Sequence, residues 1–403
     1  MNQYLRSALV CLLATTMVLA ASKPRIFSLN ADYLSQTKAR LADKDALLLP
    51  AFSQLRNEAD KALQRGPYSV TFKERTPPSQ DKHDYLSLAP YFWPDANTKD
   101  GLPYIRRDGE TNPDSKKGTD ANTIAQMGKD VGTLGLAFYF TGNEAYAAHA
   151  TKLIRTWFLD ADTKMNPHFK YAQAVLGRND GRGTGLIEAR NFIHVVEAAG
   201  LLAESKAWTA QDQQALQAWF RAFTQWMQTS PHGKDEAKAK NNHGSWYAAQ
   251  LACYAMFIGD EALARQTAEA AKTRIAWQIE PDGKQPLELE RTKSFGYTVF
   301  NLNALMTLAE VAQRVGVDLY NYKTADGRSL RRALDYTAPF LDATKAWPDK
   351  QIVDTKSDRA ELAELLRRAS LIYQEKSYEE LLAKPSAAEA TKQRWQLLWP
   401  LRK

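Results

Sequence analysis

Cysteine is scarce in this chain: the 403 residues hold two, and Cys11 lies in an apolar stretch near the start. Cys253 then stands alone, and a lone thiol without metal-ligand spacing around it indicates a packed small residue. The sequence also lacks a zinc motif of the HExxH or Cys/His type, a glycine-rich phosphate loop and a GxSxG elbow. These absences exclude cysteine chemistry and disfavour zinc, nucleotide and serine-hydrolase machineries. We therefore expect no metal and no cofactor.

Long hydrophobic runs are also few. Apart from residues 8–21, no stretch is apolar and long enough to span a bilayer. That stretch follows Arg6 and ends in small residues, which is the pattern of a secretory signal. We expect residues 1–21 to be a signal peptide cleaved near Ala20, and the mature chain to be periplasmic or secreted.

Excess charge of one sign is slight. There are 53 Lys and Arg residues against 46 Asp and Glu, a net charge of +7, which becomes about +6 once Arg6 is removed with the signal. This bias is too small to indicate nucleic acid as a partner. It suits an acidic substrate, although a solvated, slightly basic surface explains it equally simply. Hydrophobic residues make up 44% of the chain, enough for a sizeable core.

Alternating strand patterns are scarce too, and helix signals run through almost the whole chain. Helix starts are predicted near Asp120, Asn143, Gly185, Thr209, Asn242, Asp260, Ser294 and Arg328. Taken in pairs they recur every ~55 to 65 residues, a period typical of stacked helical hairpins. This predicts an all-α fold, a closed or nearly closed ring of antiparallel hairpins, forming one domain over residues 22–403. We expect it to act as a monomer.

Residues 66–118 are the exception. They contain few helix signals and many proline, glycine and aromatic residues. A loop-rich stretch of this length inside a compact domain commonly has a function, such as walling a cleft. An irregular cover over the ring is the alternative explanation.

Polar and aromatic residues gather where several predicted helices begin. Asn241, Asn242 and His243 precede one helix, and Arg291 precedes another that carries Tyr297. Alternate helices of a hairpin ring point the same way, so these ends should meet at one mouth, where helix dipoles favour anions. Each residue also has a structural explanation: an asparagine cap, a satisfied histidine, a core tyrosine or a surface arginine.

Four segments together resemble the alginate lyase domain superfamily of polysaccharide lyases. They are HDYLSLAPYFWPD at 83–95, LPYIRRDG at 102–109, MNPH followed by YAQ within 165–173, and NNHG at 241–244. The likeness covers about residues 65–315 and is closest to the branch that acts on alginate or glucuronan. The poly(β-D-mannuronate) lyases are similar mainly in the Asn-His pair, the arginine and the tyrosine. The resemblance implies an incomplete (α/α) toroid of about six helical hairpins.

The resemblance also implies β-elimination at a uronic acid, without a metal. The proton on C5 is weakly acidic until the neighbouring carboxylate is neutralised. The family pattern gives that role to Asn242 and Arg291, with His243 beside them, and makes Tyr297 the catalytic tyrosine. For mannuronate Tyr297 can act as both base and acid, whereas guluronate requires His243 as base and Tyr297 as acid. The sequence leaves the preferred uronate, and endo or exo cutting, open.

Further residues are expected to bind the polysaccharide. This group comprises His168, Tyr171, Gln173 and Arg182 as subsite residues, Tyr91, Trp93 and Trp246 as sugar-stacking rings, Asn241, and Glu236 as a partner that orients the site. The expected function is an alginate lyase. The alternatives are a glucuronan lyase with the same residues, a non-catalytic polyuronate-binding protein, or a helical-ring glycoside hydrolase. The hydrolase would use two carboxylates among Glu188, Glu197, Asp235, Glu236, Glu288 and Glu290.

Overall fold

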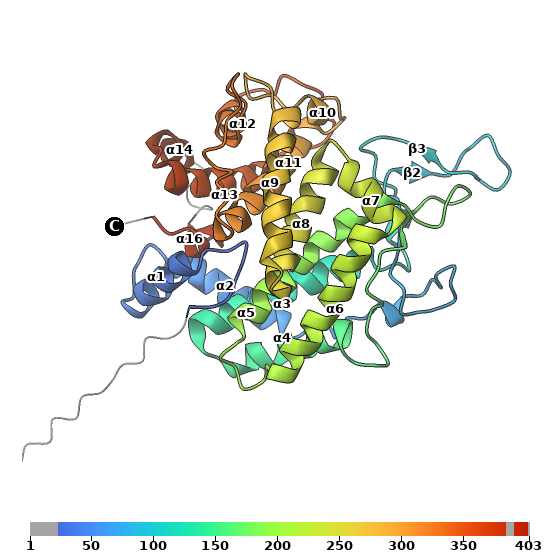
Figure 1. Cartoon of the computed structure of the whole chain (residues 1–403), viewed down its shortest axis with the longest axis horizontal. Coiled ribbons are helices and arrows are strands. Elements are labelled where there is room, and N and C mark those ends of the chain that lie inside the picture. The colour runs from blue at the N-terminus through green and yellow to red at the C-terminus, as the bar shows by residue number, and fades with distance from the viewer. Residues whose placement is uncertain (1–22, 384–390, 402–403) are drawn as a thin grey trace, which may run out of the picture.

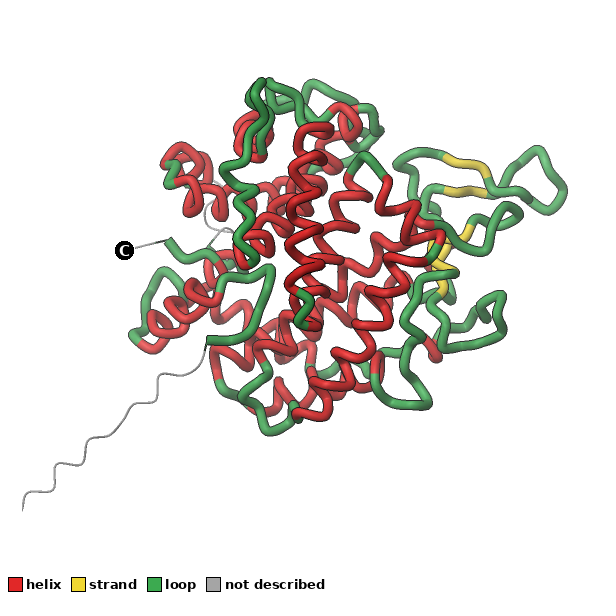
Figure 2. The backbone as a smooth tube through the Cα atoms, in the orientation of Figure 1, coloured by secondary structure: helices red, strands yellow, loops and turns green. Residues whose placement is uncertain are grey.

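The computed structural model describes residues 23–383 and 391–401. The predicted signal peptide, residues 1–21, lies outside the described residues. Figure 1 shows helices arranged around a common centre, and Figure 2 shows the few short strands on one side of them, among long loops. Within the described part of the chain, no helix is long and apolar enough to cross a membrane.

The inner wall of the ring is built from helices that follow one another in chain order (Figure 1). Each packs against the next, in the order α3 (Ala121–Thr141), α5 (Phe192–Leu201), α8 (Asn242–Ile258), α11 (Ser294–Arg314) and α13 (Lys356–Tyr373). Most residues of α8 and α11 are buried. Helices that are apolar on all sides are stable only when they are covered all round, which explains why these two lie at the centre.

Shorter or amphipathic helices cover the inner wall from outside. They are α4 (Glu144–Phe158), α6 (Ala210–Thr229), α9 (Glu261–Gln278), α12 (Leu330–Thr337) and α14 (Lys376–Leu382). The predicted capping box at the start of α6 is confirmed, because Thr209 and Asp212 each bond the other's backbone N–H. Inner and outer helices together form the (α/α) toroid that the sequence predicts.

Glycine permits the closest approach in the inner wall. A Cβ on Gly135 of α3 would lie 2.9 Å from Cβ of Ala198 on α5. A Cβ on Gly128, two turns earlier, would lie 2.6 Å from the carbonyl oxygen of Asn191. Side chains at these positions would force the two helices apart, so glycine sets their spacing.

One predicted helix begins later than expected. The segment that starts near Gly185 is a 3-10 stretch, η3 (Gly183–Asn191), and the α-helix begins only at Phe192. A Cβ on Gly185 would lie 2.4 Å from Cβ of Ala172, so this stretch is pressed against the strand before it. The remaining predicted starts agree with the structure to within two residues.

Residues 66–118 contribute three short strands to two small strand pairs. Strand β1 (Leu86–Leu88) pairs in parallel with β4 (Tyr171–Ala174), and β2 (Phe92–Trp93) pairs antiparallel with β3 (Ile105–Arg106). Short 3-10 turns, η1 (Val70–Phe72) and η2 (Pro113–Lys116), flank them. A buried ion pair of 3.2 Å between Lys73 and Asp120 ties the segment to the start of α3. The segment therefore has defined contacts with the ring.

The two ends of the chain complete the ring on the side away from these loops. Backbone N–H of Phe27 donates to Glu197 of α5 at 3.0 Å, and Arg314, at the end of α11, donates to the Phe27 carbonyl at 2.7 Å. Near the C-terminus, Arg394 pairs with Glu58 at 2.6 Å. The terminal helices are α1 (Ala31–Ala42), α2 (Leu49–Ala62) and α16 (Trp395–Leu398), and η4 (Ala338–Leu341) follows α12.

Candidate active site

Tyr297 and Arg291 meet at the start of α11. Arg291 lies in the turn after the short helix α10 (Pro286–Leu289), and Tyr297 lies in the first turn of α11. Arg291 Nη2 donates to Tyr297 Oη at 2.8 Å, and its guanidinium carbon lies 3.9 Å from the centre of the Tyr297 ring. Tyr297 Oη in turn donates to Tyr91 Oη at 2.9 Å. A phenol, a second phenol and a cation thus share one hydrogen-bond chain.

Asp108 holds the arginine of this chain in place. Its carboxylate accepts from Arg291 Nη2 at 2.8 Å and from Arg291 Nε at 3.2 Å. The Thr292 hydroxyl also donates to the Asp108 carbonyl at 2.9 Å. Burial alone would raise the pKa of Asp108, but the hydrogen bonds and charge of Arg291 outweigh it and hold that pKa below its ordinary value. The loop segment is therefore fastened to the catalytic mouth by an ionised carboxylate.

Tyr297 is a neutral phenol in this environment. Burial raises its pKa, the neighbouring Tyr91 raises it further, and the charge of Arg291 lowers it by less than these two together. Arg291 therefore favours the phenolate, as a neighbouring cation does, but too weakly to offset burial and Tyr91. A tyrosine that keeps its proton at neutral pH is ready to act as an acid.

His243 is oriented by Glu236 of α7 (Pro231–Lys238). His243 Nδ1 lies 2.7 Å from Glu236 Oε1, and the glutamate side chain is buried. A carboxylate accepts hydrogen bonds, so this contact favours the tautomer with the proton on Nδ1 and leaves the Nε2 lone pair free to accept a proton. Glu236, which was expected to orient the site, thus contacts His243.

The glycine that follows His243 has a geometric reason. A Cβ on Gly244 would lie 2.0 Å from the carbonyl oxygen of Ala239 and 2.1 Å from Arg274 Nη1. Arg274 donates to that same carbonyl at 2.8 Å. The link between α7 and α8 therefore crosses the first turn of α8 too closely for any side chain, which keeps Glu236 and His243 within hydrogen-bond distance.

Asn241 and Asn242 make different contacts at the start of α8. The Asn241 side chain caps the helix by accepting from backbone N–H of His243 at 3.3 Å. Asn242 is completely buried and bonds Glu288 of α10 twice, through its backbone N and its Nδ2, both at 2.6 Å. Its Oδ1 has no partner among the described residues. Burial raises the pKa of Glu288 to about 6, although the Asn242 hydrogen bonds oppose that rise.

The predicted subsite residues form a second polar group along β4 and the start of η3. Gln173 Oε1 accepts from Arg182 Nη2 at 2.8 Å, and Gln173 Nε2 donates to Glu188 at 3.2 Å. Tyr171 is buried, with an exposed fraction of 6%. His168 Nε2 lies 3.0 Å from Asp84. Arg182 and Gln173 are therefore held by protein contacts, whereas His168 stays partly exposed.

The three rings expected to stack on sugars lie in different environments. Tyr91 directs its hydroxyl to Tyr297, as described above. Trp93 is half-buried and donates from Nε1 to the Glu110 carbonyl at 3.0 Å. Trp246 has an exposed fraction of 6% and packs on Phe300 at 5.1 Å, where both line a cavity of about 570 Å³ inside the ring. Trp246 therefore lies behind the mouth.

Two groups in this site would be hard to find by sequence reasoning alone. Asp108 lies within the LPYIRRDG motif, and Glu288 is one acidic residue among many, so no local pattern marks either as a partner of Arg291 or Asn242. Their roles depend on contacts across 183 and 46 residues of chain. The carboxylates available to a hydrolase are largely engaged, since Glu188, Glu197, Glu236 and Glu288 all accept hydrogen bonds from protein donors.

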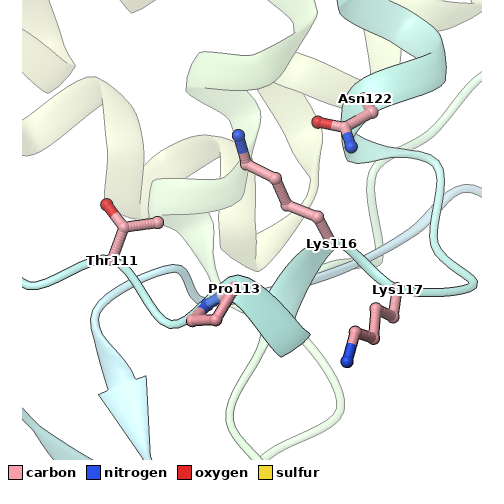
Figure 3. A pocket seen from close by; sticks show the side chains of 5 residues that line it. All are labelled: Thr111, Pro113, Lys116, Lys117 and Asn122. Atoms are coloured by element: carbon pink, nitrogen blue, oxygen red, sulfur yellow. The ribbon is translucent and has the colours of Figure 1, made fainter.

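A further hollow of about 490 Å³ lies beside the loop segment. Figure 3 shows it lined by Thr111, Pro113, Lys116, Lys117 and Asn122, with the two lysine side chains extending in different directions. Within the described ranges, no cluster of three or more His, Cys, Asp or Glu side chains is arranged to hold a metal ion.

The residues at the mouth supply the groups that elimination next to a carboxylate requires. The imidazole of His243 can accept a proton, the phenol of Tyr297 can donate one, and the guanidinium of Arg291 is a fixed cation beside that phenol. All three come from the N-terminal ends of α8 and α11 or the turn before α11. An acid, a base and a cation are the groups by which elimination from an acidic sugar is catalysed.

Comparison with known proteins agrees with this class. The family model "Alginate lyase" matches residues 69–347. The structure of an alginate lyase from Bacteroides ovatus is 41% identical, with a TM-score of 0.89, and the match covers 94% of this chain and 100% of that one. Alginate lyase A1-III from Sphingomonas species A1 shares the fold at 19% identity and a TM-score of 0.58, with 94% and 97% covered. No curated protein matches.

The protein is thus a polysaccharide lyase with an (α/α)-toroid fold. It belongs to the alginate lyase family, because the family model spans most of the chain.

Proposed function

We propose that this protein cleaves alginate by β-elimination at the mouth formed by α8, α11 and the loop segment. The observation that carries the proposal is the contact of Arg291 with Tyr297 at 2.8 Å, in a chain 41% identical to an alginate lyase over 94% of its length. In this proposal the phenol protonates the leaving oxygen and the cation opposes the charge of the substrate carboxylate. The mildly basic chain, with its net charge of +7, suits a polyanionic substrate.

In the substrate, the reaction breaks two bonds and forms two. A base removes the C5 proton, the electrons of the C5–H bond become the C4–C5 double bond, and the C4–O4 bond breaks as O4 takes a proton from an acid. Arg291 and Asn242 oppose the charge of the substrate carboxylate, so that negative charge can develop at C5. In this proposal the neutralisation is done by protein groups and does not depend on a metal.

The hydrogen bonds of His243 and the raised pKa of Tyr297 favour one assignment of base and acid. His243 has a free Nε2 and Tyr297 holds its proton, which is the pairing that guluronate requires, with base and acid on opposite faces. For mannuronate, Tyr297 must first lose its proton, and Arg291 is the group that stabilises the phenolate. We propose that guluronate uses His243 and Tyr297 together, whereas mannuronate uses Tyr297 alone.

Export is part of the same proposal. Alginate is a large, charged polymer that does not cross membranes, so a lyase acting on it needs to meet it outside the cytoplasm. We propose a periplasmic or secreted location, on the strength of the signal pattern in residues 1–21.

The first experiment is an ultraviolet assay for the conjugated double bond. Mature protein is incubated with poly-mannuronate, poly-guluronate and glucuronan, with and without a chelator. We expect absorbance to rise on the two alginate polymers and to be insensitive to the chelator.

Other results would contradict the proposal in recognisable ways. Turnover of glucuronan alone would change the substrate but keep the chemistry. New reducing ends without ultraviolet absorbance would indicate hydrolysis by carboxylates. Binding without any change in chain length would indicate a non-catalytic polyuronate-binding protein.

A further inference from the structure

The buried side chain of Asn242, at the centre of the site, has an incomplete set of hydrogen bonds among the described residues. Its backbone N and its Nδ2 both donate to Glu288, while Oδ1 is buried without a partner among the described residues. A buried polar atom without a partner is destabilising, so its presence calls for an explanation. In this orientation the free atom of the amide is Oδ1, a hydrogen-bond acceptor. Opposing the charge of a substrate carboxylate requires a hydrogen-bond donor instead.

Glu288 decides which amide atom is free. An ionised carboxylate can only accept, so it holds Nδ2 and leaves Oδ1 unpaired. A protonated Glu288 keeps one oxygen as acceptor for backbone N–H of Asn242, which the helix holds in place, and carries its proton on the other oxygen. That proton would face Nδ2 at 2.6 Å, donor against donor, unless the amide turns over. After turning, Oδ1 accepts from Glu288 and the NH₂ group becomes free.

We propose that Glu288 is a positioning residue that takes up a proton when substrate binds and turns the Asn242 amide so that NH₂ faces the substrate carboxylate. The inference rests on the proposed elimination at this site. The proton comes from solvent, and no covalent bond of the substrate is involved. Asn242 has no exposed surface, so contact with the substrate also requires neighbouring side chains to move aside.

The surroundings of Glu288 favour that proton. Its exposed fraction is 1%, and burial raises its pKa to about 6 against the opposing hydrogen bonds from Asn242. The charged and titratable groups facing it are Arg291, from the turn before α11, and His243, from α8, and both lower its pKa. Tyr297 is hydrogen-bonded to Arg291, and Glu236 is hydrogen-bonded to His243. A substrate carboxylate entering this group adds negative charge and raises the pKa further.

Glu288→Gln separates the two protonation states. Glutamine offers one oxygen to backbone N–H of Asn242 and one NH₂ group to Oδ1, so it reproduces the protonated glutamate at every pH. We expect the ratio of kcat/KM for E288Q to that of the wild type to rise by up to about tenfold per pH unit above pH 6, because only the wild type loses the proton. The ratio cancels the titrations of groups far from position 288, which both proteins share.

The matched control is Glu290→Gln, two residues further on and exposed. Its ratio to wild type should not change with pH. A ratio for E288Q that stays constant or falls as pH rises would overturn the proposal, because it would show that the site needs the ionised carboxylate. Circular dichroism and urea unfolding confirm that both variants fold.

A second measurement does not depend on activity. The infrared carbonyl band of a protonated carboxylic acid is recorded against pH for wild type and E288Q, and the difference isolates Glu288. We expect a band that disappears as pH rises through about 6, and that persists to higher pH when a Tyr297→Phe background is saturated with oligouronate. Absence of the band at pH 5 would overturn the proposal. Absence of ultraviolet activity in the wild type would refute the proposed function while leaving this titration readable.

Discussion

At the scale of single residues, a few side chains of the candidate site each make several contacts. Tyr297 receives a hydrogen bond from Arg291 and gives one to Tyr91, so its hydroxyl is fixed in both directions. Such a hydroxyl is already placed for proton transfer before substrate arrives, which removes part of the entropic cost of the reaction.

Tyr297→Phe removes that hydroxyl and little else. We expect turnover of alginate to fall by about 10²- to 10⁴-fold, the range typical of a lost general acid or base. The ring packing remains, so circular dichroism and thermal unfolding should be close to those of the wild type. A nearly normal rate in the ultraviolet assay would refute the assignment.

Arg291→Ala tests charge neutralisation. Removing a donor that stabilises developing negative charge typically costs about 10²- to 10³-fold in kcat. We expect kcat to fall by this order, with a smaller change in KM. A change confined to KM would instead place Arg291 in a substrate-binding subsite, and Arg106→Ala, an exposed neighbour of Asp108, serves as control.

Sequence reasoning named the candidate residues and, of their partners, Glu236, but it missed Asp108 and Glu288. The motifs led to Asn242, His243, Arg291 and Tyr297, whose placement at helix ends followed from the hairpin pattern. The net pKa of Tyr297 depends on burial and on Tyr91, which a linear pattern does not reveal.

At the scale of elements, the candidate site residues lie at or just before the starts of α8 and α11. The capping box of α6 was predictable because both of its residues are local. The η3 stretch was not, because the contact between Gly185 and Ala172 comes from tertiary packing.

Asp212 makes the start of α6 sensitive to acid. The hydrogen bond from Arg155 lowers its pKa to about 2, against an opposing effect of burial. Because the folded pKa lies below the unfolded value of ~3.9, this stabilisation is present above about pH 4 and is lost as pH falls toward 2. We expect Asp212→Asn to be less stable at pH 7 and to lose less on acidification than the wild type, as measured by urea unfolding between pH 2.5 and 7.

Thr209→Ser is the matched control for this cap. It keeps the hydroxyl that accepts from backbone N–H of Asp212, whereas Thr209→Ala removes it and should cost about 1 kcal/mol. Equal acid sensitivity in Asp212→Asn and wild type would contradict the role given to the Asp212–Arg155 pair.

At the scale of the whole molecule, the site and the chain ends lie at opposite ends of the inner helices. The starts of α8 and α11 carry the candidate catalytic residues, while residues near their ends contact the segment around Phe27. The period of helix starts predicted the ring, but no pattern in the sequence indicated which segment would complete it.

Glu197→Ala tests that separation. It leaves the buried N–H group of Phe27 and the neighbouring N–H of Ser28 without their acceptor, at ~1–3 kcal/mol for each. We expect a lower urea midpoint and unchanged kcat/KM for alginate, with Glu380→Ala on exposed α14 as control. Loss of activity in the folded variant would instead favour a carboxylate-based hydrolase.

The Asp108–Arg291 pair has a consequence for selectivity. Asp108 pairs with the cation that the proposed function assigns to the uronate carboxylate. Under that function Asp108 is an internal competitor for Arg291, and a polysaccharide gains access to the cation only if it brings a negative charge of its own. Neutral glycans of the same shape would have nothing to exchange for this contact, so the site discriminates against them before any chemistry begins.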